Sequence, residues 1–145
     1  MWLPVLPVLG TARRCLALDL PGFGRSGGEL DTGPATVPAL AAAVLAAADA
    51  LGLDRFDLAG HDIGGGIAQH IAATSGRVGR LVLMNSVMFD SWPVPAVERF
   101  RDPDVRAATT ARELLDARAA STQRAVTRKL SDEELAVYLS PWTSP

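Results

Sequence analysis

The chain has 145 residues, of which 48% are hydrophobic, and its 14 basic and 16 acidic side chains give a formal net charge of −2 at pH 7. This length suits one globular domain with a hydrophobic core. The charges are interspersed, so they form no basic stripe for nucleic acid and no acidic tail. The single cysteine, Cys15, excludes an intrachain disulfide and a CxxC metal or redox pair.

The N-terminal residues MWLPVLPVL are apolar, but they lack a basic leading region and contain Pro4 and Pro7. We therefore expect no signal peptide. The alanine-rich stretch at residues 40–53 is shorter than the roughly 20 residues of a membrane-spanning helix. The sequence predicts a soluble, cytoplasmic protein with neither a membrane nor a nucleic acid as partner.

Three short apolar runs, at residues 14–20, 56–60 and 80–85, alternate with helical patterns. This alternation is typical of parallel βαβ units whose sheet is covered on both faces. The first predicted helix follows Thr36, a suitable N-cap, and ends before Gly52. Its apolar residues recur at helical spacing, at Leu40, Val44, Ala47, Ala48 and Leu51. The second carries Ile63, Ile67 and Ile71 and ends near Gly76.

The character of the sequence changes near residue 90. Residues 1–90 hold the predicted strands, whereas residues 91–145 are charged and helical. The expected breaks in this helical segment are Pro103 and the Ser131-Asp132-Glu133-Glu134 stretch. In that stretch Ser131 can cap a helix that has Glu134 at its third position. The sequence therefore predicts an α/β fold class, with a helical segment after the sheet.

The segment Gly60-His61-Asp62-Ile63-Gly64 joins a predicted strand directly to a predicted helix. It has the G-x-nucleophile-x-G form of a nucleophile elbow. In such an elbow the backbone of the central residue is strained, and the residues two positions before and two positions after it must be small. Gly60 and Gly64 meet that need. Asp62 would then lie at a helix N-terminus, with the backbone N–H of Ile63 directed at developing negative charge.

An aspartate in this position needs no base, because a carboxylate with a pKa near ~4 is ionised at neutral pH. Asp62 could attack the carbon of a small electrophile, by displacing a halide or opening an epoxide, and form an ester. A histidine-activated water would then hydrolyse that ester. This chemistry needs neither a cofactor nor a metal.

Other interpretations exist for these residues. Asp62 could simply be the N-cap of the following helix. His61 precedes Asp62 and should point to the opposite side of the strand, so we expect it to be structural. His70 is expected to be an ordinary residue on the helix surface.

Three segments, DLPGFGRSGG at residues 19–28, GHDIGG at 60–65 and LVLMNS at 81–86, resemble the α/β-hydrolase superfamily. The resemblance implies a partial α/β-hydrolase core at residues 1–90, with strands four to six of the fold, and the start of a helical lid at residues 91–145. With aspartate in place of serine at the elbow, the sequence resembles the branch of the superfamily that contains haloalkane dehalogenases, haloacetate dehalogenases and epoxide hydrolases.

Within that branch the substrate class stays open. Relatives carry Trp or Arg after the nucleophile and, in haloacetate dehalogenases, Arg on the next turn, where this chain has Ile63 and Ile67. The only tyrosine, Tyr138, lies late in the lid. The catalytic acid that some dehalogenases place after the sixth strand is replaced by Asn85, and Asp90 is a substitute candidate for that acid.

The resemblance also implies that parts of the fold are absent from this chain. These are the third strand, which lies between the fourth and fifth, its oxyanion loop, and the catalytic histidine and usual acid. We therefore expect no turnover. A non-catalytic binding protein on the same scaffold is the alternative.

A dinucleotide site is a further alternative, because Gly22-Phe23-Gly24-Arg25-Ser26-Gly27 is a literal G-x-G-x-x-G. Such a site needs a helix that begins within the motif. The prolines and glycines at Gly28, Gly33, Pro34 and Pro38 delay the helix here, so we expect this segment to be a loop.

Overall fold

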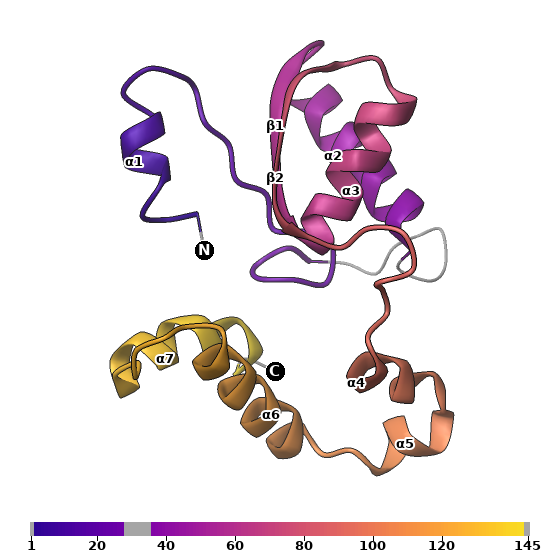
Figure 1. Cartoon of the computed structure of the whole chain (residues 1–145), viewed down its shortest axis with the longest axis vertical. Helices are drawn as coiled ribbons and strands as arrows, with labels where there is room; N and C mark the ends of the chain where they lie inside the picture. The colour runs from indigo at the N-terminus through magenta and orange to yellow at the C-terminus, as the bar shows by residue number, and fades with distance from the viewer. Residues whose placement is uncertain (1, 28–35, 144–145) are drawn as a thin grey trace.

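A computed structural model of the chain describes residues 2–27 and 36–143 (Figure 1). Its elements, in chain order, are α1 (Leu6–Leu9), α2 (Val37–Ala50), β1 (Phe56–Asp62), α3 (Ile63–Thr74), β2 (Val78–Ser86), α4 (Pro95–Glu98), η1 (Arg99–Arg101), α5 (Pro103–Ala108), α6 (Ala111–Arg124), α7 (Asp132–Leu139) and η2 (Ser140–Trp142).

The two strands β1 and β2 pair in parallel, with Ala59 opposite Val82, and α3 makes the crossover between them. Both strands include the predicted runs and extend beyond them by a few residues. Helices α2 and α3 lie on the same face of this pair (Figure 1). Because the strands are parallel, their C-terminal ends, at Asp62 and Ser86, lie at the same edge of the sheet.

The hydrophobic core lies between α2, α3 and this face of the sheet. Its buried members are Leu40, Ala41, Ile67 and Ile71. Phe56 and Leu58 of β1 pack against the cluster. Because strand side chains alternate between faces, Asp57, Ala59 and His61 belong to the opposite face.

The predicted helix limits in the core are confirmed. The Thr36 hydroxyl accepts a hydrogen bond of 3.3 Å from the backbone N–H of Ala39 and so caps α2. Gly52 and Gly76 follow α2 and α3 with φ of +65° each, a conformation that glycine adopts without steric cost.

The prediction of a strand at residues 14–20 is wrong for this structure. The segment runs without regular secondary structure, and the described sheet has only β1 and β2. A strand is defined by hydrogen bonds to a neighbour, and no described strand lies beside this one. Leu16 and Leu18 are exposed as a result, and Cys15 is half-buried.

The expectation of a sheet covered on both faces also fails within the described residues. No described helix packs extensively on the face that carries Asp57, where Arg13 forms a salt bridge of 3.3 Å with Asp57. Leu81, Val82 and Leu83 of β2 are each more than a third exposed.

The helical segment after β2 lies apart from the sheet (Figure 1). Pro103 begins α5, and Ser131 with Glu134 forms the predicted capping box at α7. A second capping box, formed by Thr110 and Glu113 at α6, was not predicted, although its T-x-x-E spacing is readable in the sequence.

An aromatic contact joins this segment to the N-terminal part of the chain. The rings of Phe23 and Trp142 meet edge to face with centroids 6.0 Å apart. The guanidinium of Arg118 in α6 lies 3.7 Å above the Trp142 ring. One aromatic side chain therefore ties the loop after residues 14–20 to both α6 and η2.

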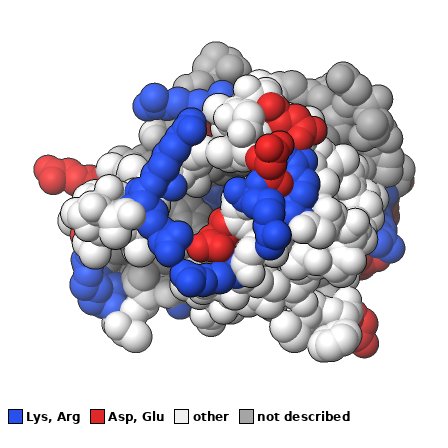
Figure 2. All heavy atoms as spheres, turned by 90° about the horizontal axis from the view of Figure 1, so that it is seen from above, with Lys and Arg blue, Asp and Glu red and all other residues white. Residues whose placement is uncertain are grey.

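Charged side chains of both signs share the surface. Figure 2 shows Lys and Arg side chains around a hollow, with Asp and Glu side chains inside it and beside it. Positive charge on this face is thus interrupted by negative charge. Among the helices described for residues 2–27 and 36–143, none has the length and apolar character required to span a bilayer.

Candidate active site

Asp62 occupies the junction between β1 and α3. It is the last residue of the strand, and the helix begins at Ile63. Its backbone has φ of 53° and ψ of −126°, a conformation that L-residues rarely adopt. The elbow geometry predicted from the glycine spacing is therefore confirmed.

The tight turn requires a glycine at position 60. A Cβ on Gly60 would lie 2.4 Å from the backbone oxygen of Gly64 and 2.7 Å from the Cα of Gly65. The second close approach is made by Gly65, where a Cβ would lie 2.0 Å from Ser86 Oγ. A Cβ on Gly64 would meet no described atom within 4 Å. The second position that must lack a side chain is therefore Gly65, and not Gly64 as predicted.

The side chain of Asp62 does not cap α3. It makes no capping hydrogen bond, and the residue is exposed. The N-cap interpretation is therefore not supported. The N–H groups of the first helical turn, including that of Ile63, have no acceptor within the helix and can stabilise an anion at this position.

The other titratable candidates do not join Asp62. Within residues 2–27 and 36–143, no hydrogen bond or ion pair links Asp90, His61 or His70 to Asp62. Asp90 is exposed in the turn after β2, and His70 is a half-buried residue in the middle of α3. By the alternation of strand side chains, His61 belongs to the face of β1 opposite Asp62. Among the described residues, no acid or base is therefore hydrogen-bonded to the Asp62 carboxylate.

The end of β2 has an irregularity that the sequence did not reveal. His61 pairs with Met84 and Asp62 pairs with Ser86, so Asn85 is an extra residue between two paired ones. Asn85 also has a positive φ, of 42°. This β-bulge lies beside the elbow, at the same edge of the sheet. The available signal was only that asparagine tolerates positive φ better than most residues.

The glycine-rich segment at residues 22–27 forms turns rather than a helix start. Gly22 and Gly24 have φ of 77° and 58°. The Asp19 carboxylate accepts a hydrogen bond of 3.0 Å from the Arg25 backbone N–H and so closes the loop. The expected delay at Gly28, Gly33 and Pro34 lies outside the described residues, and the next described helix, α2, begins at Val37. A dinucleotide-binding helix does not begin in the described part of the motif.

Comparison with known proteins places the chain in a family. The family model of the alpha/beta hydrolase fold matches residues 1–141, so the chain belongs to the α/β-hydrolase family. This agrees with the parallel strands, the crossover helix and the elbow.

The similar proteins carry the names of different hydrolase activities. RutD of Rhizobium rhizogenes (strain K84 / ATCC BAA-868), whose name describes it as a carbamate hydrolase, is 41% identical over 87 residues, 59% of this chain and 32% of RutD. The haloalkane dehalogenase DbeA-M1 loop variant from Bradyrhizobium elkanii is 27% identical, with a TM-score of 0.70 over 99% of this chain and 52% of that one. A hydrolase from Pseudomonas aeruginosa PA01 is 32% identical, with a TM-score of 0.68 over 83% and 44%. The matched segment spans about a third of RutD, and this chain matches about half of the two solved structures.

Proposed function

We propose that Asp62 is the nucleophile of a hydrolase that forms a covalent ester with a small electrophilic substrate. One observation carries this proposal: the strained backbone of Asp62 at the end of a strand, with an exposed carboxylate that caps no helix. Strain of this kind persists where the surroundings impose it, and it is concentrated at functional sites. The resemblance to haloalkane dehalogenases supports the choice of substrate class.

In the first step an oxygen of the Asp62 carboxylate attacks the substrate carbon. The carbon–halogen bond breaks, and the halide leaves with the electron pair, so no proton is needed. With an epoxide the ring carbon–oxygen bond breaks instead, and the alkoxide takes a proton from water. Nucleophilic attack requires the carboxylate and a bound electrophile only.

Hydrolysis of the ester is a separate step with its own requirements. A water must lose a proton to a base, and the oxyanion that forms must be held by N–H groups such as that of Ile63. Neither His61 nor His70 is joined to Asp62 in the described structure. We assign residues 91–145 to part of a helical lid. Without a base beside Asp62, the ester should accumulate rather than turn over.

Halide release tests this proposal. The chain is incubated with excess 1-bromohexane, and free bromide is measured over time. We expect at most one equivalent of bromide per chain and none above background from Asp62→Asn. The matched control is Asp54→Asn, which removes an exposed carboxylate before β1 and should release the same amount as the unmodified chain.

Two results would contradict the proposal. Equal release by the unmodified chain and Asp62→Asn would show that Asp62 does not react, as in a non-catalytic binding protein. Release of many equivalents would show that His61 or His70 does act as a base after all.

A further inference from the structure

The carbonyl group of Asp62 is held from the end of the neighbouring strand. The backbone N–H of Val87, the first residue after β2, donates to this carbonyl oxygen at 3.1 Å. The peptide unit that contains this oxygen is planar and carries the N–H of Ile63 on its opposite side. The bond from Val87 therefore fixes the ψ angle of Asp62, which is −126°, and with it the direction of the Ile63 N–H.

Val87 is itself held against the N-terminal half of α3. The Gln69 side chain, which is half-buried, donates from Nε2 to the carbonyl oxygen of Val87 at 3.0 Å and to that of Gly65 at 3.1 Å. A Cβ on Gly66 would lie 2.8 Å from Cγ2 of Val87, so the valine side chain packs closely on the helix at this glycine. A hydrogen bond and a packing contact thus both fix Val87 to α3.

These contacts form a closed ring around the elbow. From Asp62 the chain enters α3, the Gln69 side chain joins that helix to Val87, and Val87 returns to the carbonyl oxygen of Asp62. The Asp62 side chain adds no constraint of its own, because it makes no capping hydrogen bond. A strained backbone persists only where the surrounding structure imposes it. Among the described residues, Gln69 supplies the side-chain hydrogen bonds of this ring.

We propose that Gln69 is a positioning residue for the nucleophile, because it holds Val87 on α3 and so keeps the Asp62 backbone in its strained conformation. That conformation places the carboxylate for attack and directs the Ile63 N–H that would stabilise an oxyanion. The amide suits this position because it donates to two carbonyl oxygens without carrying a charge. The role of Gln69 in the reaction rests on the proposed function of Asp62, whereas its hold on the elbow does not.

The test compares Gln69→Met with Arg77→Met. Methionine is unbranched and of similar length to glutamine, but it has no N–H to donate. The Arg77 side chain also donates to two backbone carbonyl oxygens, those of Leu53 and, at 3.1 Å, of Asp54. It lies at the start of β2, at the end of the sheet opposite the elbow, so Arg77→Met is the matched control for a general loss of stability.

Two measurements are made on each protein. The first is the rate constant for single-turnover alkylation by 1-bromohexane, corrected for the folded fraction that urea unfolding and circular dichroism give. The second is hydrogen exchange of individual backbone amides, followed by NMR, which needs no reaction at Asp62. A second variant, Gln69→Glu, keeps the shape of the side chain. Its carboxylate has no proton to donate at neutral pH and regains one when it is protonated.

We expect Gln69→Met to alkylate about 2- to 10-fold more slowly than the unmodified chain, the value of one neutral hydrogen bond. The Val87 N–H should exchange faster by a similar factor, while the amides that pair β1 with β2 keep their rates. Arg77→Met should lose stability and keep the corrected alkylation rate. For Gln69→Glu, the rate relative to the unmodified chain at the same pH should rise as the pH falls from about 7 to about 5.

Several outcomes would overturn the inference. Alkylation by Gln69→Met at the corrected rate of the unmodified chain would do so and leave the role of Asp62 intact. Equal acceleration of exchange at all amides, or equal slowing of alkylation in Arg77→Met, would show that Gln69 contributes to stability only. If the unmodified chain shows no more alkylation than Asp62→Asn, the nucleophile proposal fails, and the role of Gln69 in the reaction fails with it. Exchange of the Val87 N–H then still decides whether Gln69 holds the elbow.

Discussion

At the scale of single residues, Gly60 is the position where the elbow leaves no space. A Cβ added to Gly60 would overlap the backbone of Gly64 and Gly65. These backbone atoms cannot move aside as the end of a flexible side chain can. The strain at Asp62 and the closeness of this approach have the same origin, which is the direct passage from β1 into α3.

Substitution of Gly60 by alanine should therefore destabilise the chain by about 1–3 kcal/mol, the usual cost of overpacking. The matched control is Gly64→Ala, whose Cβ would meet no described atom within 4 Å. That control should be neutral or slightly stabilising, because alanine is favoured over glycine in a helix. Urea unfolding followed by circular dichroism gives both values. Equal losses in the two variants would contradict the assignment of the close approach to Gly60.

The sequence predicts part of this site because its signal is local. Gly60, Asp62 and Ile63 lie within one turn, and the pattern of a strand, a glycine pair and a helix is enough to place them. Asn85 and the steric role of Gly65 depend on β2, which is distant in sequence. Whether a strand carries a bulge depends on its pairing partner, which no local pattern reports.

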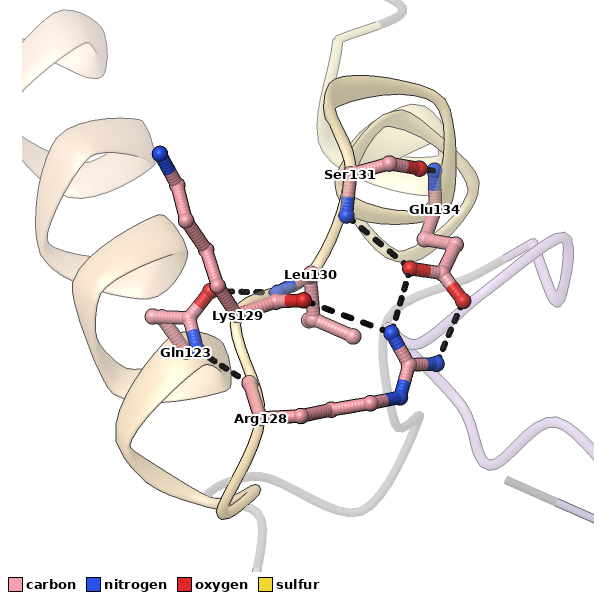
Figure 3. A network of polar contacts seen from close by, with 6 residues as sticks. All are labelled: Gln123, Arg128, Lys129, Leu130, Ser131 and Glu134. Carbon is pink, nitrogen blue, oxygen red and sulfur yellow. Dashed lines mark hydrogen bonds and ion pairs between the residues drawn. The ribbon is translucent and has the colours of Figure 1, made fainter.

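At the scale of elements, the junction of α6 and α7 is held by a polar network (Figure 3). The Glu134 carboxylate accepts hydrogen bonds from the Ser131 backbone N–H at 2.9 Å and from both terminal nitrogens of Arg128. Gln123 bonds to the Arg128 carbonyl oxygen at 2.8 Å and to the Leu130 N–H at 2.9 Å. Leu130 is buried beneath these contacts.

This network makes the α6–α7 junction sensitive to acid. The hydrogen bond from Arg128, followed by that from the Ser131 backbone, lowers the pKa of Glu134 from 4.5 to about 2. A lowered pKa in the folded state means that the contribution to stability is present above pH 4.5 and is lost as the pH falls toward 2. The group is exposed, so the effect should be small and should weaken further in salt.

We expect Glu134→Gln to remove this acid dependence. Above pH 4.5 the unmodified chain should be more stable than the variant, and this difference in stability should disappear as the pH falls toward 2. Urea midpoints across this range give the comparison. Identical pH profiles for the two proteins would show that the pair does not stabilise the junction. Glu133→Gln is the control, because Glu133 is exposed on the same helix outside the network.

Helix limits were easier to predict than strands. The cap at Thr36 and the capping box at Ser131 depend on neighbouring residues, and both are present in the structure. Residues 14–20 have the composition of a strand but no partner among the described strands. Composition favours extended backbone, whereas membership of a sheet requires a neighbour that the segment cannot specify.

At the scale of the whole molecule, the core is small and one-sided. The buried cluster lies between α2, α3 and β1, and much of the apolar surface of β2 is open. Contact between the helical segment and the N-terminal loop depends on Trp142, with Phe23 at its edge and Arg118 on its face. The elbow, in contrast, is surrounded by core elements, so it is the best supported part of the proposed site.

Peptide mapping shows directly whether Asp62 is the nucleophile. After incubation with 1-bromohexane, the unmodified chain and Asp62→Asn are digested, and the modified residue is located by tandem mass spectrometry. We expect one hexyl ester, on Asp62, and no modified peptide from the variant. Esters spread over exposed carboxylates such as Asp54, Asp57 and Asp90, in equal yield from both proteins, would contradict it.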